Sequence, residues 1–468
     1  MSAALALVLL HLAGAAAMAG VGAAQWARWA NVALAAAGLP LALLAGPGGE
    51  GAWLSADALA RLLVPLAAFV GLTCAVYSAA TLDAERFDAA RARLYHACFQ
   101  AFLGANHAAL LADNLGLMWV AVEAATIASV LVVAIHRTPA AIEAAWKFFI
   151  LCGVGIALAL FGTLLLALAA GDAGGAERLS FAALRALGAE LDAGLVSLAF
   201  LFLLAGYGTK AGLVPLHAWM PDAHAEGPVA ISAVLSGLLL NTALAAVLRA
   251  KALADGVDAS VPPGALLAAL GLASVLLASV ALWRRRDARR LFAWSSIEQM
   301  GLAAIAFGIG APLAGLLQMA GNALLKSAVF FAVGQAAILR GSQQMRDISG
   351  LVAARPVLGW GLAVAIAGVA GLPPFAVFLA EMALLFEAAS RAPLLALAVG
   401  AGLAVAGAGL LRAALRLCFG PARAEFAAPV PRAVIVVLWL HLALAALCGV
   451  FAPDAAAAVF ARAAEVMR

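Results

Sequence analysis

Long apolar runs follow one another along almost the whole chain, with only short polar segments between them. A helix of about 20 apolar residues crosses the roughly 30 Å hydrocarbon core of a bilayer. Only helices and closed barrels satisfy their backbone polar groups in lipid, and these runs lack the alternation of barrel strands. We therefore expect an all-α polytopic membrane protein of about fourteen transmembrane helices, near residues 1–24, 29–45, 58–80, 93–112, 114–135, 144–170, 194–218, 228–250, 262–283, 291–310, 312–339, 356–390, 393–419 and 432–452.

Two of the expected helices contain prolines close to charged residues. Pro215 falls five residues after Lys210, and the pair Pro373 and Pro374 falls shortly before Glu381. Proline removes a backbone donor and obstructs the carbonyl one turn back, so the pattern predicts breaks in helices 7 and 12. Broken helices in corresponding places of two halves are typical of inverted-repeat transporters. A simple kink in an inert helix is the alternative at each site.

Five charged residues stand among apolar neighbours at membrane depth: Glu123, Lys210, Glu298, Lys326 and Glu381. An ionisable group there is unfavourable by a few kcal/mol, so it usually faces a wet interior path and marks transport. Glu123 and Lys210 can exchange a proton if they touch, whereas a fixed ion pair or a snorkelling end is the static alternative. For Glu298, near its helix end, the two interpretations are equally open. The 87 positions from Glu123 to Lys210 resemble the 83 from Glu298 to Glu381, which fits two similar five-helix units.

Arginine supplies nearly all the basic residues, since only four of the 28 are lysine. Arginine effectively never loses its proton, whereas a desolvated lysine does, so a proton carrier at depth requires lysine. The placing of lysine at depth, with arginine almost everywhere else, favours proton transfer over static packing. GC-rich coding also explains why lysine is scarce elsewhere.

The composition, with 66% hydrophobic and 11% charged residues, leaves no room for a soluble domain. Basic residues concentrate in loops after odd-numbered helices, above all in 284–290, which places these loops in the cytoplasm and the N-terminus outside. The first segment has no Lys or Arg before its apolar run, so we interpret it as a retained helix and not a signal peptide. The net charge of +4 therefore reflects orientation in a bacterial cytoplasmic (inner) membrane and implies no nucleic acid.

Metal and redox chemistry have no sequence support in this chain. Its five cysteines are scattered singly in apolar helices without CxxC spacing, and no Gly-rich phosphate loop follows a strand. We expect no cofactor in the chain and no catalysis by it alone. His217 and His224 lie at the mouth of the seventh helix, where histidine passes protons near neutral pH or packs at the interface. We expect that the remaining histidines (His11, His96, His107, His136 and His441) do not cluster, so we assign them no role.

The string GTKAGLVPLHAWMPDAHAEGPVAISAVLSGLLLNTALAAVLR, residues 208–249, resembles the signature of the antiporter-type subunits of respiratory complex I, Mrp antiporters and membrane-bound hydrogenases. NLGLMWVAVEA, WSSIEQMG, ALLKSAVFF and GLPPFAVFLAE follow the family's order along essentially the whole chain. VAVEAATIASVLVV and SSIEQMG, with a short C-terminus, look most similar to hydrogenase-4 component F. The resemblance implies N-terminal helices 1–3 (residues 1–92), two inverted repeats of helices 4–8 (93–250) and 9–13 (251–420), and helix 14 (421–468).

The resemblance also implies roles for individual residues. Glu123 matches the glutamate that modulates its neighbouring lysine, Lys210 the proton-carrying lysine, Lys326 the central lysine, and Glu381 the exit-side charge. Two positions depart from the family. Asn241 and Asn322 stand where many relatives have a lysine and a histidine, so the link between the two lysines would depend on water.

Together these features predict a proton-translocating subunit of a multisubunit redox-driven complex. Protons would pass from near His217 to Lys210, Lys326 and Glu381. Its partners would be other membrane subunits and a peripheral cytoplasmic enzyme arm, and any iron-sulfur, flavin or metal centres would belong to these partners. Sodium is less suited to an axis of amines. The alternatives are a non-pumping scaffold that docks a soluble enzyme, which the two asparagines favour, and a proton-driven uptake module for inorganic carbon.

Overall fold

The computed structural model describes residues 2–48, 53–171, 177–421, 428–450 and 454–465. Apart from three isolated β-bridges, the regular structure in these ranges is helical. The helices are α1 (Ala3–Val21), α2 (Ala27–Leu44), α3 (Ala58–Glu85), α4 (Ala89–Leu111), α5 (Leu115–Val133), α6 (Pro139–Ala169), α7 (Phe181–Leu187), α8 (Ala193–Ala211), α9 (Trp219–Glu226), α10 (Val229–Val234), α11 (Leu240–Asp255), α12 (Pro263–Arg284), α13 (Ala288–Gly308), α14 (Pro312–Arg340), α15 (Met345–Ile348), α16 (Leu351–Ala354), α17 (Pro356–Val369), α18 (Ala376–Arg391), α19 (Pro393–Leu417), α20 (Arg432–Val450) and α21 (Asp454–Glu465).

Eleven helices in the described ranges are long and apolar enough to cross a membrane. The count becomes twelve if the bent pair Met345–Ala354 and Pro356–Val369 is one span. The expected fourteen is therefore not confirmed. α4, α13 and α18 lie beside the other helices but do not qualify by length and composition. α4 and α13 begin with arginines, and α18 has only 16 residues.

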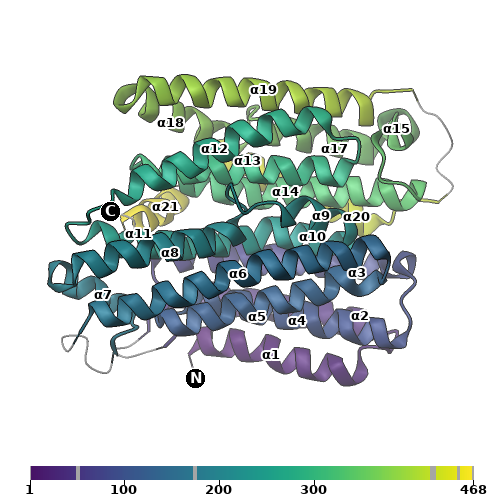
Figure 1. Ribbon diagram of the computed structural model, residues 1–468. Helices are drawn as coiled ribbons and strands as arrows, with labels where there is room; N and C mark the ends of the chain where they lie inside the picture. Colours follow the sequence, from purple (N-terminus) through teal and green to yellow (C-terminus); the bar gives the residue numbers. More distant parts are fainter. Residues whose placement is uncertain (1, 49–52, 172–176, 422–427, 451–453, 466–468) are drawn as a thin grey trace.

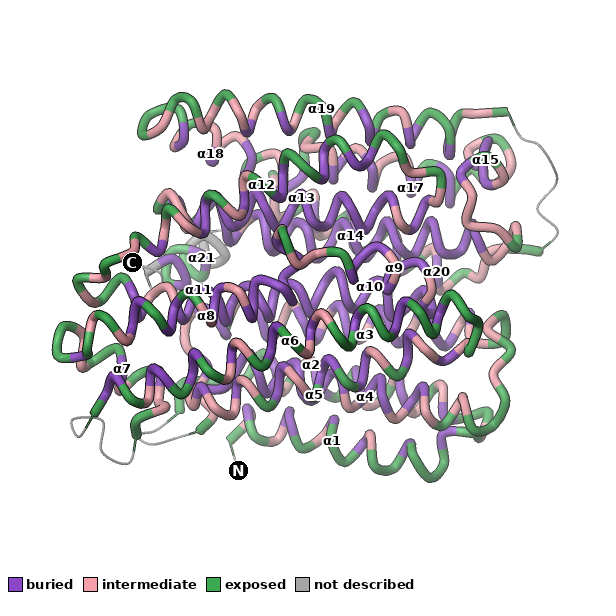
Figure 2. The backbone as a smooth tube through the Cα atoms, in the orientation of Figure 1, coloured by how far each residue is buried: buried purple, intermediate pink, exposed green. Residues whose placement is uncertain are grey.

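The long helices run side by side in one bundle, with α1 at one edge and α19 at the other (Figure 1). Burial increases towards the middle (Figure 2): the most apolar part of the span containing α10 and α11 is completely buried, whereas only 33% of the corresponding part of α1 and 28% of that of α19 is buried. In a bilayer the exposed apolar side chains of the outer helices face acyl chains. The centre of the bundle is thus the place that lipid cannot reach.

Eight of the described helices, α1, α3, α4, α5, α6, α7, α8 and α13, begin at a side chain that caps the first free backbone amides. Asp57, Asp88, Asn114 and Asp192 each accept a hydrogen bond from the amide three residues later, at the starts of α3, α4, α5 and α8. Such caps satisfy donors that have no partner inside the helix. They explain why the helices begin where polar residues interrupt the apolar runs.

One end of the bundle gathers the arginine-rich loops. The loop 285–287 pairs with the segment 341–345 through backbone hydrogen bonds, including Met345 N to Arg286 O at 2.9 Å. Arg290, next to this loop, forms an ion pair with Glu226 at the end of α9. We call this end, with the loops 86–88, 285–287 and 341–344, the basic end.

Both predicted helix breaks are present, and the two have the same local sequence. α8 ends at Ala211, and α9 begins at Trp219; α17 ends at Val369, and α18 begins at Ala376. Each break contains Gly-Leu-x-Pro, starting at Gly212 or Gly371, with the glycine at a positive φ of 78° or 71°. Glycine adopts this left-handed conformation without the strain that a Cβ imposes. The breaks therefore arise from the glycine as well as from the prolines.

Glycine also brings two helices close together at the acid-bearing helix α13. A Cβ on Gly271 of α12 would lie 2.6 Å from the Gly301 carbonyl oxygen, and a Cβ on Gly301 would lie 2.7 Å from the Gly271 carbonyl oxygen. Neither distance is possible for a real side chain, so the two backbones touch here because both residues lack one. This contact fixes the position of α13 at Gly301, which lies about one turn after Glu298 on the same helix.

Candidate functional site

At the break after α8, backbone groups that lose their helical partners form hydrogen bonds with side chains instead. Val214 N donates to Ser274 Oγ at 2.9 Å, and Trp219 Nε1 donates to the Thr209 carbonyl at 2.9 Å. An irregular segment at membrane depth is tolerated only where such partners, or water, replace the helical bonds. The break is therefore a built feature that places Lys210 in the last turn of a half-helix.

Lys210 is completely buried and forms an ion pair with Glu123 of α5. The distance from Lys210 Nζ to Glu123 Oε2 is 3.1 Å, and the Glu123 side chain is 20% exposed. Lys210 Nζ also donates to Thr126 Oγ1, one turn along α5. The Thr126 hydroxyl donates to the Val122 carbonyl, so its oxygen is free to accept from the ammonium. The carboxylate and the hydroxyl together stabilise the charged lysine.

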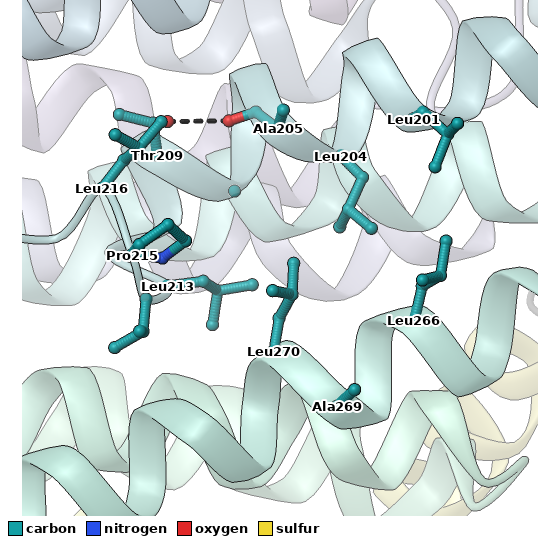
Figure 3. Close-up of a pocket in the computed structure, with 12 residues that line it drawn as sticks. Leu201, Leu204, Ala205, Thr209, Leu213, Pro215, Leu216, Leu266, Ala269 and Leu270 are labelled. Carbon is teal, nitrogen blue, oxygen red and sulfur yellow. Dashed lines mark hydrogen bonds between the residues drawn. The ribbon is translucent and has the colours of Figure 1, made fainter.

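A cavity of about 290 Å³ lies on another side of the same break. Its lining comes from α8, the break and α12, and it consists almost entirely of leucine, alanine and valine side chains (Figure 3). The Thr209 hydroxyl does not open towards water there, because it donates to the Ala205 carbonyl at 2.7 Å. Lys210 is not among the lining residues. The apolar cavity is thus no part of the charged site.

Lys326, in the middle of α14, is also completely buried but has a different partner. Its Nζ donates to the Phe292 carbonyl of α13 at 2.9 Å and lies 6.0 Å from the centre of the Phe292 ring. No carboxylate lies within 4.0 Å of it among the described residues. Glu298, also on α13, interacts with it electrostatically from farther away. Lys326 is therefore held by a carbonyl dipole and a remote acid.

The break of the twelfth helix lies beside two acids, Glu298 and Glu381, and two glutamines, Gln299 and Gln318. Gln299 Nε2 donates to the Val369 carbonyl, the last residue of α17, at 3.1 Å, and its Oε1 accepts from Gln318 Nε2. Glu381 is 4% exposed and interacts electrostatically with Glu298. Its carboxylate occupies the space that a Cβ on Gly371 would fill. The two acids, two glutamines and break thus form one cluster.

Gln299 and Gln318 are absent from the residues that the sequence singled out. One signal for them was available, because Gln318, Asn322 and Lys326 recur every four residues on α14 and share one face of the helix. Gln299 follows Glu298 directly, so no spacing distinguishes it from an ordinary helical neighbour.

Asn241 lies on α11 and Asn322 on α14, one turn before Lys326, and both side chains are buried. Asn241 Nδ2 donates to the Gly237 carbonyl at 3.3 Å and the Met319 carbonyl at 3.2 Å, while its Oδ1 has no partner. Neither polar atom of the Asn322 amide has a hydrogen-bond partner among the described residues. Buried amides without partners usually bond to ordered water. Both asparagines therefore offer binding sites for water.

The helix that carries Asn241 has an unexpected π-turn at Leu235–Leu239. The sequence predicted one uninterrupted helix at 228–250, and periodicity carries no sign of the change. π-turns are rare and occur often at functional sites. The turn includes Gly237, whose carbonyl accepts from Asn241.

The two histidines that we placed at the mouth of helix 7 occupy different environments. His217 lies at the basic end in a cavity of about 460 Å³ whose lining also includes Lys147, Asp222 and Arg290. His224 is not at the mouth, because α9 turns into the bundle and buries it completely. Its Nδ1 bonds to the Met220 carbonyl at 2.9 Å, and it interacts electrostatically with Lys326.

The prediction that the remaining histidines do not cluster was wrong for two of them. The rings of His11 on α1 and His107 on α4 are stacked, with centroids 5.2 Å apart and planes 13° from parallel. The residues are far apart in the chain, and only the packing of α1 on α4 brings them together. Within the described ranges, no group of three or more His, Cys, Asp or Glu could hold a metal ion.

Comparisons with known proteins show which family this chain resembles. Residues 112–407 match the family described as NADH:quinone oxidoreductase/Mrp antiporter, TM. The hydrogenase-4 component F homolog of Methylacidiphilum infernorum is 45% identical over 414 residues, covering 86% of each chain. Hydrogenase-4 component B of Escherichia coli is 26% identical and covers 85% of this chain, which spans 62% of that relative. The predicted resemblance to this group is confirmed.

Solved structures share the fold at low sequence identity. A chain of the membrane-bound sulfane sulfur reductase, an archaeal respiratory membrane complex, matches with a TM-score of 0.88 at 22% identity, covering 100% of this chain and 98% of its own. A chain of respiratory complex I from Thermus thermophilus matches with a TM-score of 0.84 at 22% identity, covering 99% of both. At this identity the likeness shows the fold alone.

Proposed function

The chain belongs to the NADH:quinone oxidoreductase/Mrp antiporter transmembrane family, and from that premise we propose that it moves protons across a bacterial cytoplasmic membrane. One observation carries the proposal. A completely buried lysine, Lys210, ends a broken half-helix and contacts an acid, Glu123, at 3.1 Å. A lysine in such a place alternates between a paired, charged state and an unpaired, deprotonated one when its partner moves.

The proposed route runs from the basic end to the cluster at the twelfth helix. Protons arrive from the cavity beside His217, reside on Lys210, and cross to Lys326 through water held by Asn241 and Asn322. The unsatisfied amides of both asparagines support this step, since they provide bonds that only water can complete. From Lys326 the proton passes to the cluster of Glu298 and Glu381 and leaves on the opposite side.

The basic end is proposed to face the cytoplasm, with the N-terminus outside, because basic loops remain on that side. Residues 93–250 and 251–420 would then form two inverted repeats of five helices, which the shared Gly-Leu-x-Pro breaks support. The chain would act within a multisubunit complex, beside other membrane subunits and a peripheral arm. A reaction in a partner would shift the electrostatic field at the Glu123 and Lys210 pair and so move the proton.

The test is proton flow through the full chain reconstituted in liposomes, driven by a potassium diffusion potential and measured with a pH-sensitive dye in the lumen. We expect Lys210→Ala to lower the flow by roughly 100-fold or more, the loss typical when a positioned proton carrier is removed. Lys251→Ala is the matched control, because Lys251 pairs with Asp255 outside the proposed route. Unchanged flow in Lys210→Ala would refute the proposal.

A non-pumping scaffold is the second candidate, and Asn241 and Asn322 favour it because an amide carries no charge. Purification of the native complex through a tag on this chain separates the two. A scaffold predicts a soluble enzyme bound to a complex in which wild-type and Lys210→Ala chains conduct equally.

A further inference from the structure

Three polar side chains form a stripe along α4 that the proposed route does not use. We call His96, Gln100 and His107 the α4 stripe; all three are buried, with exposures of 2%, 0% and 0%. Their spacing of four and seven residues puts them on one face of the helix. His96 lies near the basic end, and His107 lies about 16 Å farther along α4 at the helical rise of 1.5 Å per residue.

Gln100 is oriented by two helices of the N-terminal region. Its Nε2 donates to Asn31 Oδ1 of α2 at 2.6 Å and to the Asn31 carbonyl at 3.1 Å. Its Oε1 can therefore only accept, and it lies 2.7 Å from His11 Nδ1. His11 Nδ1 consequently carries a proton, and in the neutral ring Nε2 is the site for a second one.

The stacked pair of His11 and His107 suits proton exchange better than packing. Neither ring nitrogen of His107 makes a hydrogen bond of ordinary geometry among the described residues, although the Leu103 carbonyl is nearby. An aromatic or aliphatic side chain would fill this place without leaving polar atoms unsatisfied. Two charged rings 5.2 Å apart repel each other, so the pair holds at most one extra proton.

One hydrogen bond connects this region to the central axis. Thr242 Oγ1 of α11 donates to Asn106 Oδ1 at 2.7 Å, and Asn106 precedes His107 in the chain. Asn106 Nδ2 has no partner among the described residues. Thr242 in turn follows Asn241, whose Oδ1 is also unsatisfied. Unpartnered buried groups thus continue from α4 to the axis, and each is a place for water.

The other end of the stripe approaches the surface at the basic end. His96 Nδ1 has no hydrogen-bond partner among the described residues, and the ring interacts electrostatically with Arg28. Arg28 forms a bidentate ion pair with Asp83, at 2.8 and 2.9 Å, and the Asp83 side chain is 82% exposed. Among the described residues, the titratable or charged groups beside the stripe's rings are thus Arg28 and Tyr95 at His96, and His11 at His107.

We propose that the α4 stripe is a second proton uptake branch, which runs from the basic end to Thr242 beside the central axis. Water completes the gaps between its members. A proton moves from water to a His ring nitrogen and leaves from the other ring nitrogen to the next water, so no charge is lost or gained. This inference rests on the proposed function, because a branch requires a conducting axis.

The first experiment uses the liposome assay above with two substitutions at one position. His107→Phe keeps the stacked ring without its nitrogens, and His107→Gln keeps hydrogen bonding without a titratable group. We expect both to lower the flow several-fold, and His136→Gln, at a half-buried ion pair with Glu85 outside the stripe, to leave it unchanged. Wild-type flow in either His107 variant would overturn the branch, while equal flow in wild type and Lys210→Ala would count against the proposed function.

The second experiment does not depend on flow. In the full chain, labelled with ¹⁵N-histidine and embedded in lipid nanodiscs, solid-state NMR detects magnetisation transfer from water protons to ring nitrogens. The His107 signal is identified by its loss in His107→Phe. We expect transfer from water to His107 despite its complete burial. A His107 ring that receives none is dry, and this result would overturn the branch even if the axis conducts.

Discussion

The two buried lysines have opposite surroundings although both are completely buried. Lys210 lies at the end of a broken half-helix and contacts a carboxylate and a hydroxyl. Lys326 lies in the middle of an unbroken helix and donates to a backbone carbonyl, with one acid, Glu298, farther away. A direct ion pair stabilises the charged lysine, whereas a carbonyl dipole compensates desolvation less completely. In the proposed route, Lys210 holds the proton and Lys326 passes it on.

Removal of the direct partner should have the largest effect on stability. We expect Glu123→Ala to lower the free energy of unfolding by about 3–5 kcal/mol, because it leaves the Lys210 ammonium buried without its acid. Thermal unfolding in detergent measures the change. The double variant Glu123→Ala with Lys210→Ala should recover most of it. An equal loss in Glu298→Ala would contradict the difference between the two lysines.

Loss of the hydrogen bond between Gln318 and Gln299 should destabilise the cluster of acids and glutamines near Lys326. Gln318→Leu removes the donor to Gln299 Oε1 and should lower the free energy of unfolding by about 1–3 kcal/mol, the penalty for an unsatisfied buried acceptor. The volume-conserving Met319→Leu on the same helix is the control. If both variants unfold alike, the bond between the two glutamines does not stabilise the cluster.

A smaller effect is expected at the hydroxyl beside Lys210. Thr126→Val keeps the shape of the side chain, removes its hydrogen bond to the ammonium, and should destabilise the protein by about 1 kcal/mol. Ser129→Ala is matched, because the Ser129 hydroxyl bonds only to carbonyls of its own helix. The same unfolding measurement should separate the two variants, and an equal change in both would show that the contact with Lys210 adds nothing.

Substitution of Asn322, on the proposed route from Lys210 to Lys326, should have the smallest effect on stability and a large effect on proton flow. Asn322 makes no side-chain hydrogen bond with the described residues, so Asn322→Leu should change the free energy of unfolding by less than about 1 kcal/mol. It should nevertheless lower proton flow, since leucine cannot hold the water that joins Lys210 to Lys326. Normal flow with normal stability would place the connection elsewhere.

Much of the site was predictable, but its connections were not. Lys210, Lys326 and the three acids at membrane depth are visible in the sequence because a charge inside an apolar run is rare. Their pairing was open, since Glu123 and Lys210 are 87 residues apart. The stacked His11 and His107 rings and the link from Gln318 to Gln299 were missed for the same reason.

The sequence by itself determined the all-helical, multi-span fold class, the two breaks and the family, because hydropathy, proline and glycine act locally along the chain. Only the tertiary structure decided which polar groups meet. Helices such as α5 and α8 are apolar on all sides, so no periodicity shows which face turns inward. The inward face depends on close packing between helices, and that packing joins residues that no local pattern relates.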